Sequence, residues 1–571
     1  MVSVFLKRIP SGLVLFALLL FSFWLMFHTF SADTSSLSIA TKSWSDFGSH
    51  IPLIRSFSAG DNLTRLMQGK PPEHPLFPNE PIRYHFLFYA LVGILEKAGL
   101  RIDWAFNIPS ALGLFFLMLM IWKLAYELFT DTRVAALSVI FFLFNGSLSF
   151  LNFFKTHSLS LATPMDIITN AKFPSFGPWD GGDISAFWTL NIYTNQRHLG
   201  LSFALSLFVF FIILRNKSGL LPGILLGLLL FTNQAAAGMT ALFLVWFFCV
   251  KSDTRRTIFL TGIITLPFMF LLTRLTTLPT AIAWLPGYLT PAPLTILSLL
   301  KFWFLNLGLH TVFIPLGLLL APRRVTKLLL IPLLILFILP NLFRFSPDMI
   351  NNHKFFNFFL IIGNIFSAYV IVTLATYWGK VSFRRPFFVI PAYAGIQSKI
   401  KFIIRWIPVF TGMTIRIGLL LGLIGILILS GVIDLFPILN DTKIRLADIA
   451  ANPDIRFFTT IPAGSTVANS TWFYHPASLA GRPIFNGYSY FTWSYGYDQT
   501  TREKETIALY QSKSREEACT ILKQHNISYL ELSKNPESFM KPNTRLWQSL
   551  PTAYHNPATG LSVYNSKTLC P

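Results

Sequence analysis

The sequence predicts a polytopic α-helical membrane protein of about eleven spans, followed by a small soluble α/β domain. Of the 571 residues, 53% are hydrophobic and only 12% are charged, whereas an ordinary soluble domain has about 25% charged residues. Apolar runs of about 18 or more residues, the length that a helix needs to cross a hydrocarbon layer, recur between Leu13 and Phe436. This composition excludes a soluble enzyme of ordinary make-up.

Eleven segments are long and apolar enough to be expected spans. They are residues 11–30, 108–128, 133–153, 199–215, 219–234, 235–251, 257–275, 297–321, 325–344, 355–378 and 415–437. The first of them is longer than the apolar core of a signal peptide, about 7–15 residues, so we expect it to be retained. Residues 84–99 are also apolar, but they are few and include charged side chains, so we expect them to lie along the outer face.

The formal net charge of +21 belongs mainly to the membrane part. Residues 1–437 hold 33 Lys and Arg against 15 Asp and Glu, while residues 438–571 hold 13 against 10. Basic residues in short loops mark the cytoplasmic side of a membrane protein. The charge therefore predicts a cytoplasmic N-terminus and an extracytoplasmic C-terminal part, with no nucleic-acid partner.

This topology puts four segments on the outer face: residues 31–107, 154–198, 345–354 and the tail from 438. Within the tail, residues 438–571 are expected to form an α/β domain, with one or two amphipathic helices in 503–523 and strands at 465–468, 527–532 and 561–564. Cys519 and Cys570 both lie in this domain. They could pair in an oxidising compartment, and the sequence leaves that open.

One short repeat interrupts the membrane part. Residues 389–396, with the letters VIPAYAGI, are echoed by residues 406–413, with the letters WIPVFTGM. The pair resembles the translated arms of a mobile inverted-repeat element, so residues 384–414 are interpreted as an inserted element in a cytoplasmic loop. A partner-binding loop is the alternative.

The first outer loop carries ionisable residues that could do chemistry. Asp46 lies just beyond the first span and could act as a general base toward a hydroxyl or as a metal ligand, with His50 and His85 as substrate-binding candidates. The alternative for Asp46 is a solvated or helix-capping residue.

Two further polar clusters stand where the chain re-enters the membrane. Arg197 and His198 would suit a lipid phosphate, because a guanidinium can bond phosphoryl oxygens bidentately; an interfacial Arg among bulk lipid headgroups is the alternative. The segment from Asp348 to Lys354 is polar enough to be costly there without partners. In it Lys354 offers a point charge for phosphate, and the other candidates for binding substrate are Asp348, Asn352 and His353. A polar turn that caps the next helix is the alternative.

These features together resemble the GT-C superfamily of integral-membrane glycosyltransferases. The likeness rests on about eleven spans, an Asp early in a long first outer loop, a His-Pro segment (His74 and Pro75) before an amphipathic helix, a polar signature close to Asp-Asn-x-Lys that ends at Lys354, and a soluble tail. The resemblance implies that Asp46 is the catalytic centre. It also implies a polyprenyl-phosphate sugar as donor, transfer with inversion, and a place in the bacterial inner membrane.

The acidic pair familiar in that superfamily is absent, since Ser45 and Phe47 flank Asp46. A two-carboxylate or metal-bound mechanism therefore does not carry over, and a divalent cation such as Mg²⁺ or Mn²⁺ stays open. The acceptor implied is a lipid, a glycan or a protein. Membrane lipids are the other expected partners.

Two other function classes remain: a transporter or flippase of lipid-linked glycans, and a non-catalytic envelope-assembly protein. A transporter is expected to carry polar or charged groups at mid-span. The expected spans are nearly free of them, with Asn107, Asn306, Asn341 and Asn364 lying towards the ends. Motifs of nucleotide and zinc chemistry (P-loop, G-x-G-x-x-G, C-x-x-C and H-E-x-x-H) are absent from the sequence.

Overall fold

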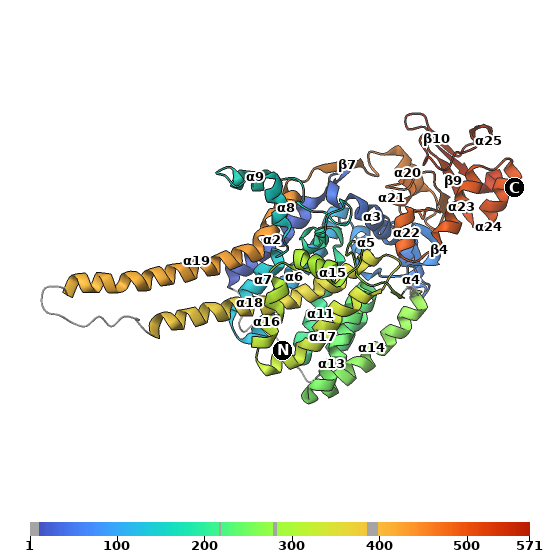
Figure 1. Cartoon of the computed structure of the whole chain (residues 1–571). Coiled ribbons are helices and arrows are strands. Elements are labelled where there is room, and N and C mark those ends of the chain that lie inside the picture. The colour runs from blue at the N-terminus through green and yellow to red at the C-terminus, as the bar shows by residue number, and fades with distance from the viewer. Residues whose placement is uncertain (1–10, 216–217, 278–281, 385–397) are drawn as a thin grey trace.

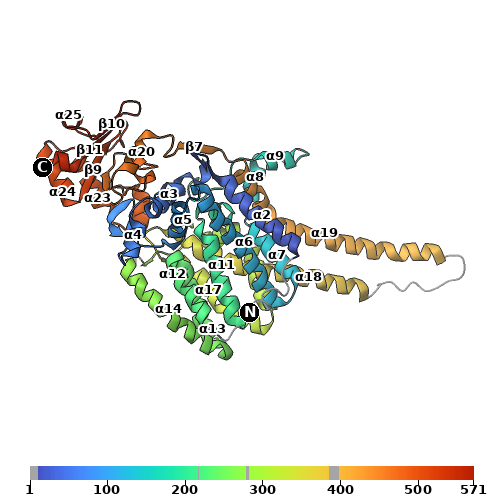
Figure 2. The same cartoon turned by 180° about the vertical axis from the view of Figure 1, so that it is seen from behind.

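The computed structural model describes residues 11–215, 218–277, 282–384 and 398–571, and for 378–384 and 398–416 it describes the backbone alone. A body of helices carries a mixed helix-and-strand domain at one end (Figures 1 and 2). Most of the expected inserted element, residues 384–414, lies outside the described residues or is described as backbone only.

In the described chain, seven helices are long and apolar enough to cross a membrane. They are α2 (Gly12–Thr29), α6 (Ile102–Phe129), α11 (His198–Arg215), α14 (Arg255–Leu275), α17 (Arg323–Leu342), α18 (His353–Arg384) and α19 (Ser398–Leu439). Each coincides with one of the expected spans. The protein is therefore a multi-pass membrane protein by the length and composition of its helices.

The other four expected spans are shorter or broken. Residues 297–321 form α15 (Ile296–Leu307) and α16 (His310–Leu320), bent by 84°. The remaining segments form the short apolar helices α7 (Thr132–Leu143), α12 (Leu220–Thr232) and α13 (Gln234–Val250). The chain turns between α12 and α13 at Asn233, whose side chain accepts a hydrogen bond from the backbone N–H of Ala236, 3.0 Å away.

The expected single span 133–153 is wrong, because α7 ends at Leu143 and a separate helix α8 (Ser149–Thr156) follows. Gly146 in the break packs against Gly308, which lies in the bend between α15 and α16. Gly308 has a positive φ of 54°, and a Cβ there would collide with the carbonyl oxygen of Gly146. The break after α7 and the bend between α15 and α16 are therefore in close backbone contact.

Polar side chains are also buried between the helices, which the low charge of the spans did not indicate. Asp434 of α19 accepts a hydrogen bond from Asn145 Nδ2 at 3.0 Å, and His310 Nδ1 lies 2.8 Å from Ser367 Oγ. A small space of ≈ 30 Å³ between His310, Asn145 and neighbouring Asn side chains is large enough for a water molecule.

The first outer loop folds into short elements against the helices. It contains β1 (Phe30–Ala32), β2 (Ser36–Ala40), α3 (Trp44–Ser58), α4 (Asn62–Met67), β3 (Glu73–His74), β4 (Phe77–Pro81) and α5 (Leu87–Lys97). At 1.5 Å per residue, the 11 residues of α5 span about 16 Å, less than a bilayer core. The second outer loop contains α9 (Thr163–Thr169) and α10 (Asn191–Asn195).

The tail begins by joining the first outer loop. Strand β7 (Lys443–Ala447) pairs antiparallel with β2, with Ile444 opposite Ile39, in a three-stranded sheet of order β1-β2-β7. The chain then forms α20 (Pro453–Thr460) before entering the domain proper.

The C-terminal domain is built on a four-stranded sheet of order β10-β11-β9-β8. Its strands are β8 (Thr466–Ala468), β9 (Ile527–Leu532), β10 (Tyr554–Asn556) and β11 (Leu561–Asn565). Its helices are α21 (Pro476–Leu479), α22 (Ser489–Ser494), α23 (Gln499–Tyr510), α24 (Arg515–Gln524), α25 (Thr544–Gln548) and α26 (Ser566–Leu569). The strands and amphipathic helices predicted for the tail are thus present, and a disulfide joins Cys519 to Cys570.

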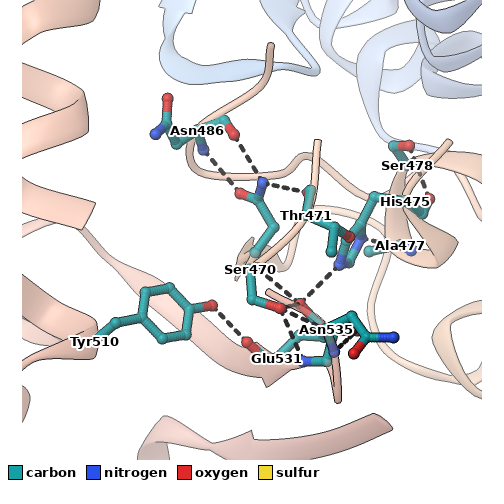
Figure 3. Close-up of polar contacts among 11 residues, drawn as sticks. Ser470, Thr471, His475, Ala477, Ser478, Asn486, Tyr510, Glu531 and Asn535 are labelled. Atoms are coloured by element: carbon teal, nitrogen blue, oxygen red, sulfur yellow. Dashed lines mark hydrogen bonds and ion pairs between the residues drawn. The ribbon is translucent and has the colours of Figure 1, made fainter. Parts of the chain in front are cut away.

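A buried polar network fixes the start of α21 (Figure 3). The Glu531 carboxylate lies 3.1 Å from His475 Nε2 and accepts hydrogen bonds from the backbone N–H and hydroxyl of Ser470. His475 Nδ1 in turn accepts the N–H of Ala477 in the first turn of α21. All polar atoms of the buried carboxylate therefore have partners, which ties α21 to the sheet.

Candidate active site

A cavity of ≈ 1300 Å³ lies between the outer loops, α13, α17 and the C-terminal domain. Figures 1 and 2 show α3 and α5 close together beside that domain. Seven of the nine candidate residues line the cavity: Asp46, His50, His85, His198, Asp348, Asn352 and Lys354. Segments that are far apart in the sequence therefore meet at one site.

Asp46 lies in the first turn of α3 with its carboxylate toward the cavity. Among the described residues no side chain or backbone group forms a hydrogen bond with this carboxylate. Burial raises the pKa of Asp46 to about 6, and the positive charge of Lys354 opposes this rise. A carboxylate with a pKa near neutrality and free oxygens can accept a proton from a hydroxyl.

The C-terminal domain holds α3 in place. The hydroxyl of Tyr474 donates a hydrogen bond to the carbonyl of Trp44, 2.5 Å away, and Phe473 packs so closely on Gly48 that a Cβ there would lie 2.8 Å from its ring. At the other end of α3, Arg55 makes a bidentate ion pair with Asp448, at 2.6 and 2.7 Å. The position of Asp46 thus depends on contacts with the tail.

Four aromatic side chains form a wall of the cavity next to Asp46. The rings of His85 and His198 are 4.1 Å apart, the hydroxyl of Tyr89 lies 3.3 Å from His198 Nδ1, and the ring of His50 lies 5.1 Å from that of Tyr89. Burial and the charge of Arg197 lower the pKa of His50 to about 3, and burial lowers the pKa of His85 as well. These two imidazoles are therefore neutral.

Each of the three histidines keeps one ring nitrogen that is buried without a partner in the protein: Nδ1 of His50, Nδ1 of His85 and Nε2 of His198. Buried polar atoms without partners are rare in folded proteins. The three side chains line the cavity, while these particular nitrogens are themselves buried. Neutral imidazoles suit hydroxyl groups, which both donate and accept.

The residues do not fit a divalent metal. Across residues 11–215, 218–277, 282–384 and 398–571 there is no group of three His, Cys, Asp or Glu side chains that could hold a metal ion.

Lys354, in the first turn of α18, supplies a positive charge to the cavity. Lys354 Nζ lies 3.4 Å from Asn351 Oδ1 and 4.8 Å from the centre of the Tyr84 ring. Asp348 caps the short turn Met349–Asn352 by accepting the N–H of Ile350 at 3.0 Å. Its other oxygen accepts a hydrogen bond from Tyr490 of the C-terminal domain, at 2.5 Å.

Two candidates have structural contacts that the sequence did not indicate. Asn352 lines the cavity, but its amide bonds the backbone of Pro340, Phe343 and Phe345, so it shapes the loop. His353 does not line the cavity. It stacks on Phe187 with ring centres 4.5 Å apart.

Arg197 is also placed differently from the expectation. Its guanidinium lies behind the cavity wall, 1% exposed, and does not line the cavity. It donates hydrogen bonds to groups of three elements, namely the carbonyls of Thr194 and Met26, the hydroxyl of Thr29 and the amide oxygen of Asn107. With its donors used inside the protein, Arg197 joins α2, α6 and α10 and does not face a phosphate.

Parts of the site come from residues that were not among the nine candidates. Tyr495 and Tyr490 of the tail line the cavity, and burial together with the charge of Asp46 raises the pKa of Tyr495 to about 12. Tyr495 therefore stays protonated and can donate a hydrogen bond. Both belong to the aromatic run of residues 487–498, for which the sequence left open stacking on sugar rings, contact with the membrane surface and a packed core.

Apolar side chains of two helices also line the cavity. They are Met239 and Leu242 of α13 and three residues of α17: Ile335, Leu336 and Leu339. The cavity lining thus combines polar residues of the outer loops with apolar residues of helices.

No protein-family model matches the chain, and no curated protein matches its sequence. Solved structures are similar at low identity. ArnT from Cupriavidus metallidurans bound to undecaprenyl phosphate is 11% identical, with 97% of each chain covered and a TM-score of 0.47. The apo state of the same protein is 10% identical, with 97% of each chain covered and a TM-score of 0.48.

The oligosaccharyltransferase of Archaeoglobus fulgidus tethered to an acceptor peptide is also similar. It is 11% identical, with 92% of this chain and 69% of that chain covered and a TM-score of 0.39. At such identities and scores, the function has to follow from the cavity itself.

Proposed function

We propose that this protein is a membrane glycosyltransferase that moves a sugar from a polyprenyl-phosphate donor to a lipid, glycan or protein acceptor. The observation that carries the proposal is the lining of the cavity. It includes the carboxylate of Asp46 and the ammonium of Lys354 together with apolar side chains of α13 and α17. A donor with a charged head and a long hydrocarbon tail matches such a mixed lining.

The donor would be held by charge at its phosphate and by apolar contacts along its polyprenyl chain. Its phosphate would lie at Lys354. Among the described residues that line the cavity, the only other Lys or Arg is Lys42. Its polyprenyl chain would run along Met239, Leu242 and Leu336 toward the lipid. The neutral imidazoles of His50 and His85, which line the cavity, would bond sugar hydroxyls.

The transfer is a displacement at the anomeric carbon. Asp46 takes the proton of the acceptor hydroxyl while that oxygen forms a bond to the sugar. The bond between the sugar and the phosphate oxygen breaks, and the phosphate leaves with the electron pair. Lys354 stabilises the charge that develops on the phosphate, and Tyr495 can donate a hydrogen bond beside it.

The helix ends support an extracytoplasmic site. Cavity residues His198, Gln234 and Leu339 lie at one end of α11, α13 and α17. At the opposite ends of these helices are Arg215, Lys251 and the pair Arg323 and Arg324. Positive charge marks the cytoplasmic side, which supports a cavity and a C-terminal domain on the outer face of the bacterial inner membrane.

A flippase of lipid-linked glycans is less well supported. The buried polar groups between the helices bond one another, as Asp434 bonds Asn145, and the space beside them is only ≈ 30 Å³. A glycan could not pass there. The large cavity instead brings a base and a cation together, which transport would not require.

The test is transfer by purified protein in proteoliposomes, with radiolabelled sugar on polyprenyl phosphate and membrane extract as acceptor. Asp46→Asn should lower the rate at least about 100-fold, the effect of losing a general base. Asp166→Asn is the matched control, because Asp166 is an outer-face carboxylate of α9 that does not line the cavity. Full activity of Asp46→Asn, or equal loss in both variants, would rule out the proposal.

A further inference from the structure

A second groove lies on the surface of the C-terminal domain, between α22 and α23. Its volume of ≈ 490 Å³ is within the range of ligand pockets. The residues that line it are Ser489, Tyr490, Trp493, Gln499, Thr500, Glu503, Lys504 and Ile507.

The groove and the cavity share one side chain. Tyr490 lines both, and its hydroxyl bonds Asp348 inside the cavity. The groove and the cavity are therefore neighbours, with the side chain of Tyr490 between them.

Two aromatic rings in the groove are exposed while their neighbours in the sequence are core residues. Trp493 is 43% and Tyr490 is 38% exposed, whereas Phe491 is 8% and Tyr497 is 3% exposed. The two exposed rings are 6.1 Å apart. Large aromatic side chains that are exposed next to each other often mark a binding surface, whereas single exposed ones do not.

The polar side of the groove offers free hydrogen-bonding groups. Glu503 and Lys504 of α23 form no ion pair with any described residue, and Thr500 is exposed. Gln499, in contrast, is used inside the domain, where it bonds Asn486 at 2.7 Å. Aromatic faces beside unpaired polar groups suit a sugar ring, which has an apolar C–H face and a rim of hydroxyls.

We propose that this groove binds the saccharide chain of the acceptor, so that the acceptor is a glycan of more than one sugar. The proposal rests on the proposed function and names its acceptor class. One negative and one positive side chain give the groove no net charge, which does not suit an anionic lipid surface. The reacting sugar would reach past Tyr490 toward Asp46 while its neighbours stack on Trp493.

The test is binding of the full-length protein, labelled and held in lipid nanodiscs, to an array of bacterial surface oligosaccharides of one to eight sugars. Wild type should bind the longer glycans, and Trp493→Ala should weaken this binding about tenfold, the effect of losing one stacked ring. Trp493→Phe should retain most of it. Trp284→Ala is the matched control, because Trp284 is 61% exposed and lies outside the groove.

Equal binding by Trp493→Ala and Trp284→Ala, or no glycan binding by wild type, overturns the proposal. If nitroxide lipids quench a fluorophore attached to Trp493→Cys, the groove lies in the membrane, and this result would also overturn the proposal. The array measures binding without transfer. Loss of binding therefore tests the groove, while the transfer assay with Asp46→Asn tests the proposed function separately.

Discussion

Asp46 and Lys354 are far apart in the sequence, yet they line the same cavity. The positive charge of Lys354 lowers the pKa of Asp46. Burial raises the pKa of Asp46 to about 6, and Lys354 holds it from rising further. A base and a cation that influence each other this way can serve one reaction, one by taking a proton and the other by stabilising a leaving phosphate.

The pH dependence of transfer follows from this pair. Asp46 is active as a base only when deprotonated, so the rate should fall as the pH drops through about 6, and not near 3.8 as for an ordinary Asp. In Lys354→Gln the opposing charge is lost, and the inflection of the residual activity should move to higher pH. The pH–rate profiles of both proteins check this; a rate that stays constant down to pH 4.5 would contradict it.

Lys354 should act on the donor phosphate. Lys354→Gln removes the positive charge beside the phosphate and should lower kcat/KM for polyprenyl-phosphate sugar about tenfold or more, since charged hydrogen bonds are worth about 1.5–3 kcal/mol. Its thermal stability should change little. Lys443→Ala, at an exposed position of β7, is the control. An unchanged kcat/KM in Lys354→Gln would remove Lys354 from the phosphate site.

Arg197 should show the opposite pattern. Arg197→Lys keeps the charge but loses the planar fork that bonds groups of α2, α6 and α10. Leaving those buried acceptors unpaired should lower the free energy of unfolding by about 3 kcal/mol, with the KM for donor unchanged. Thermal melting and donor titration separate the two effects. A raised KM with unchanged melting would instead show that Arg197 contacts the donor.

The disulfide should stabilise the C-terminal domain. Cys519 and Cys570 are 51 residues apart in the sequence, and closing a loop of that size contributes about 4 kcal/mol in the chain-entropy account. Cys519→Ser should therefore melt at a lower temperature than Cys249→Ser, which removes an exposed free thiol. Labelling with a maleimide under non-reducing conditions should modify one cysteine of the wild type; three modified cysteines would refute the pairing.

The helices could be predicted from the sequence because apolar runs long enough to cross a membrane are a strong signal. The positions where the helices are broken or bent could not be predicted in this way. The break after Leu143 and the bend at Gly308 depend on how Gly146 and Gly308 pack on each other, which is a property of two segments and is invisible in either alone.

The sequence predicted which segments meet at the site, but not which of their side chains face the cavity. The clusters around Asp46, His198 and Lys354 meet because the topology brings them to one face. Which side chain faces the cavity depends on the local backbone: in the corner before α11, His198 lines the cavity and Arg197 points behind it. The contribution of Tyr490 and Tyr495 depends on how the tail docks on α3, for which the sequence contains no short-range signal.

The most direct measurement is a structure of the protein with bound undecaprenyl phosphate. The account predicts that the phosphate bonds Lys354 in the cavity, that the hydrocarbon chain runs between α13 and α17, and that Asp46 faces the phosphate across space for a sugar. A phosphate bound at any other place, with the cavity between Asp46 and Lys354 left empty, would contradict it.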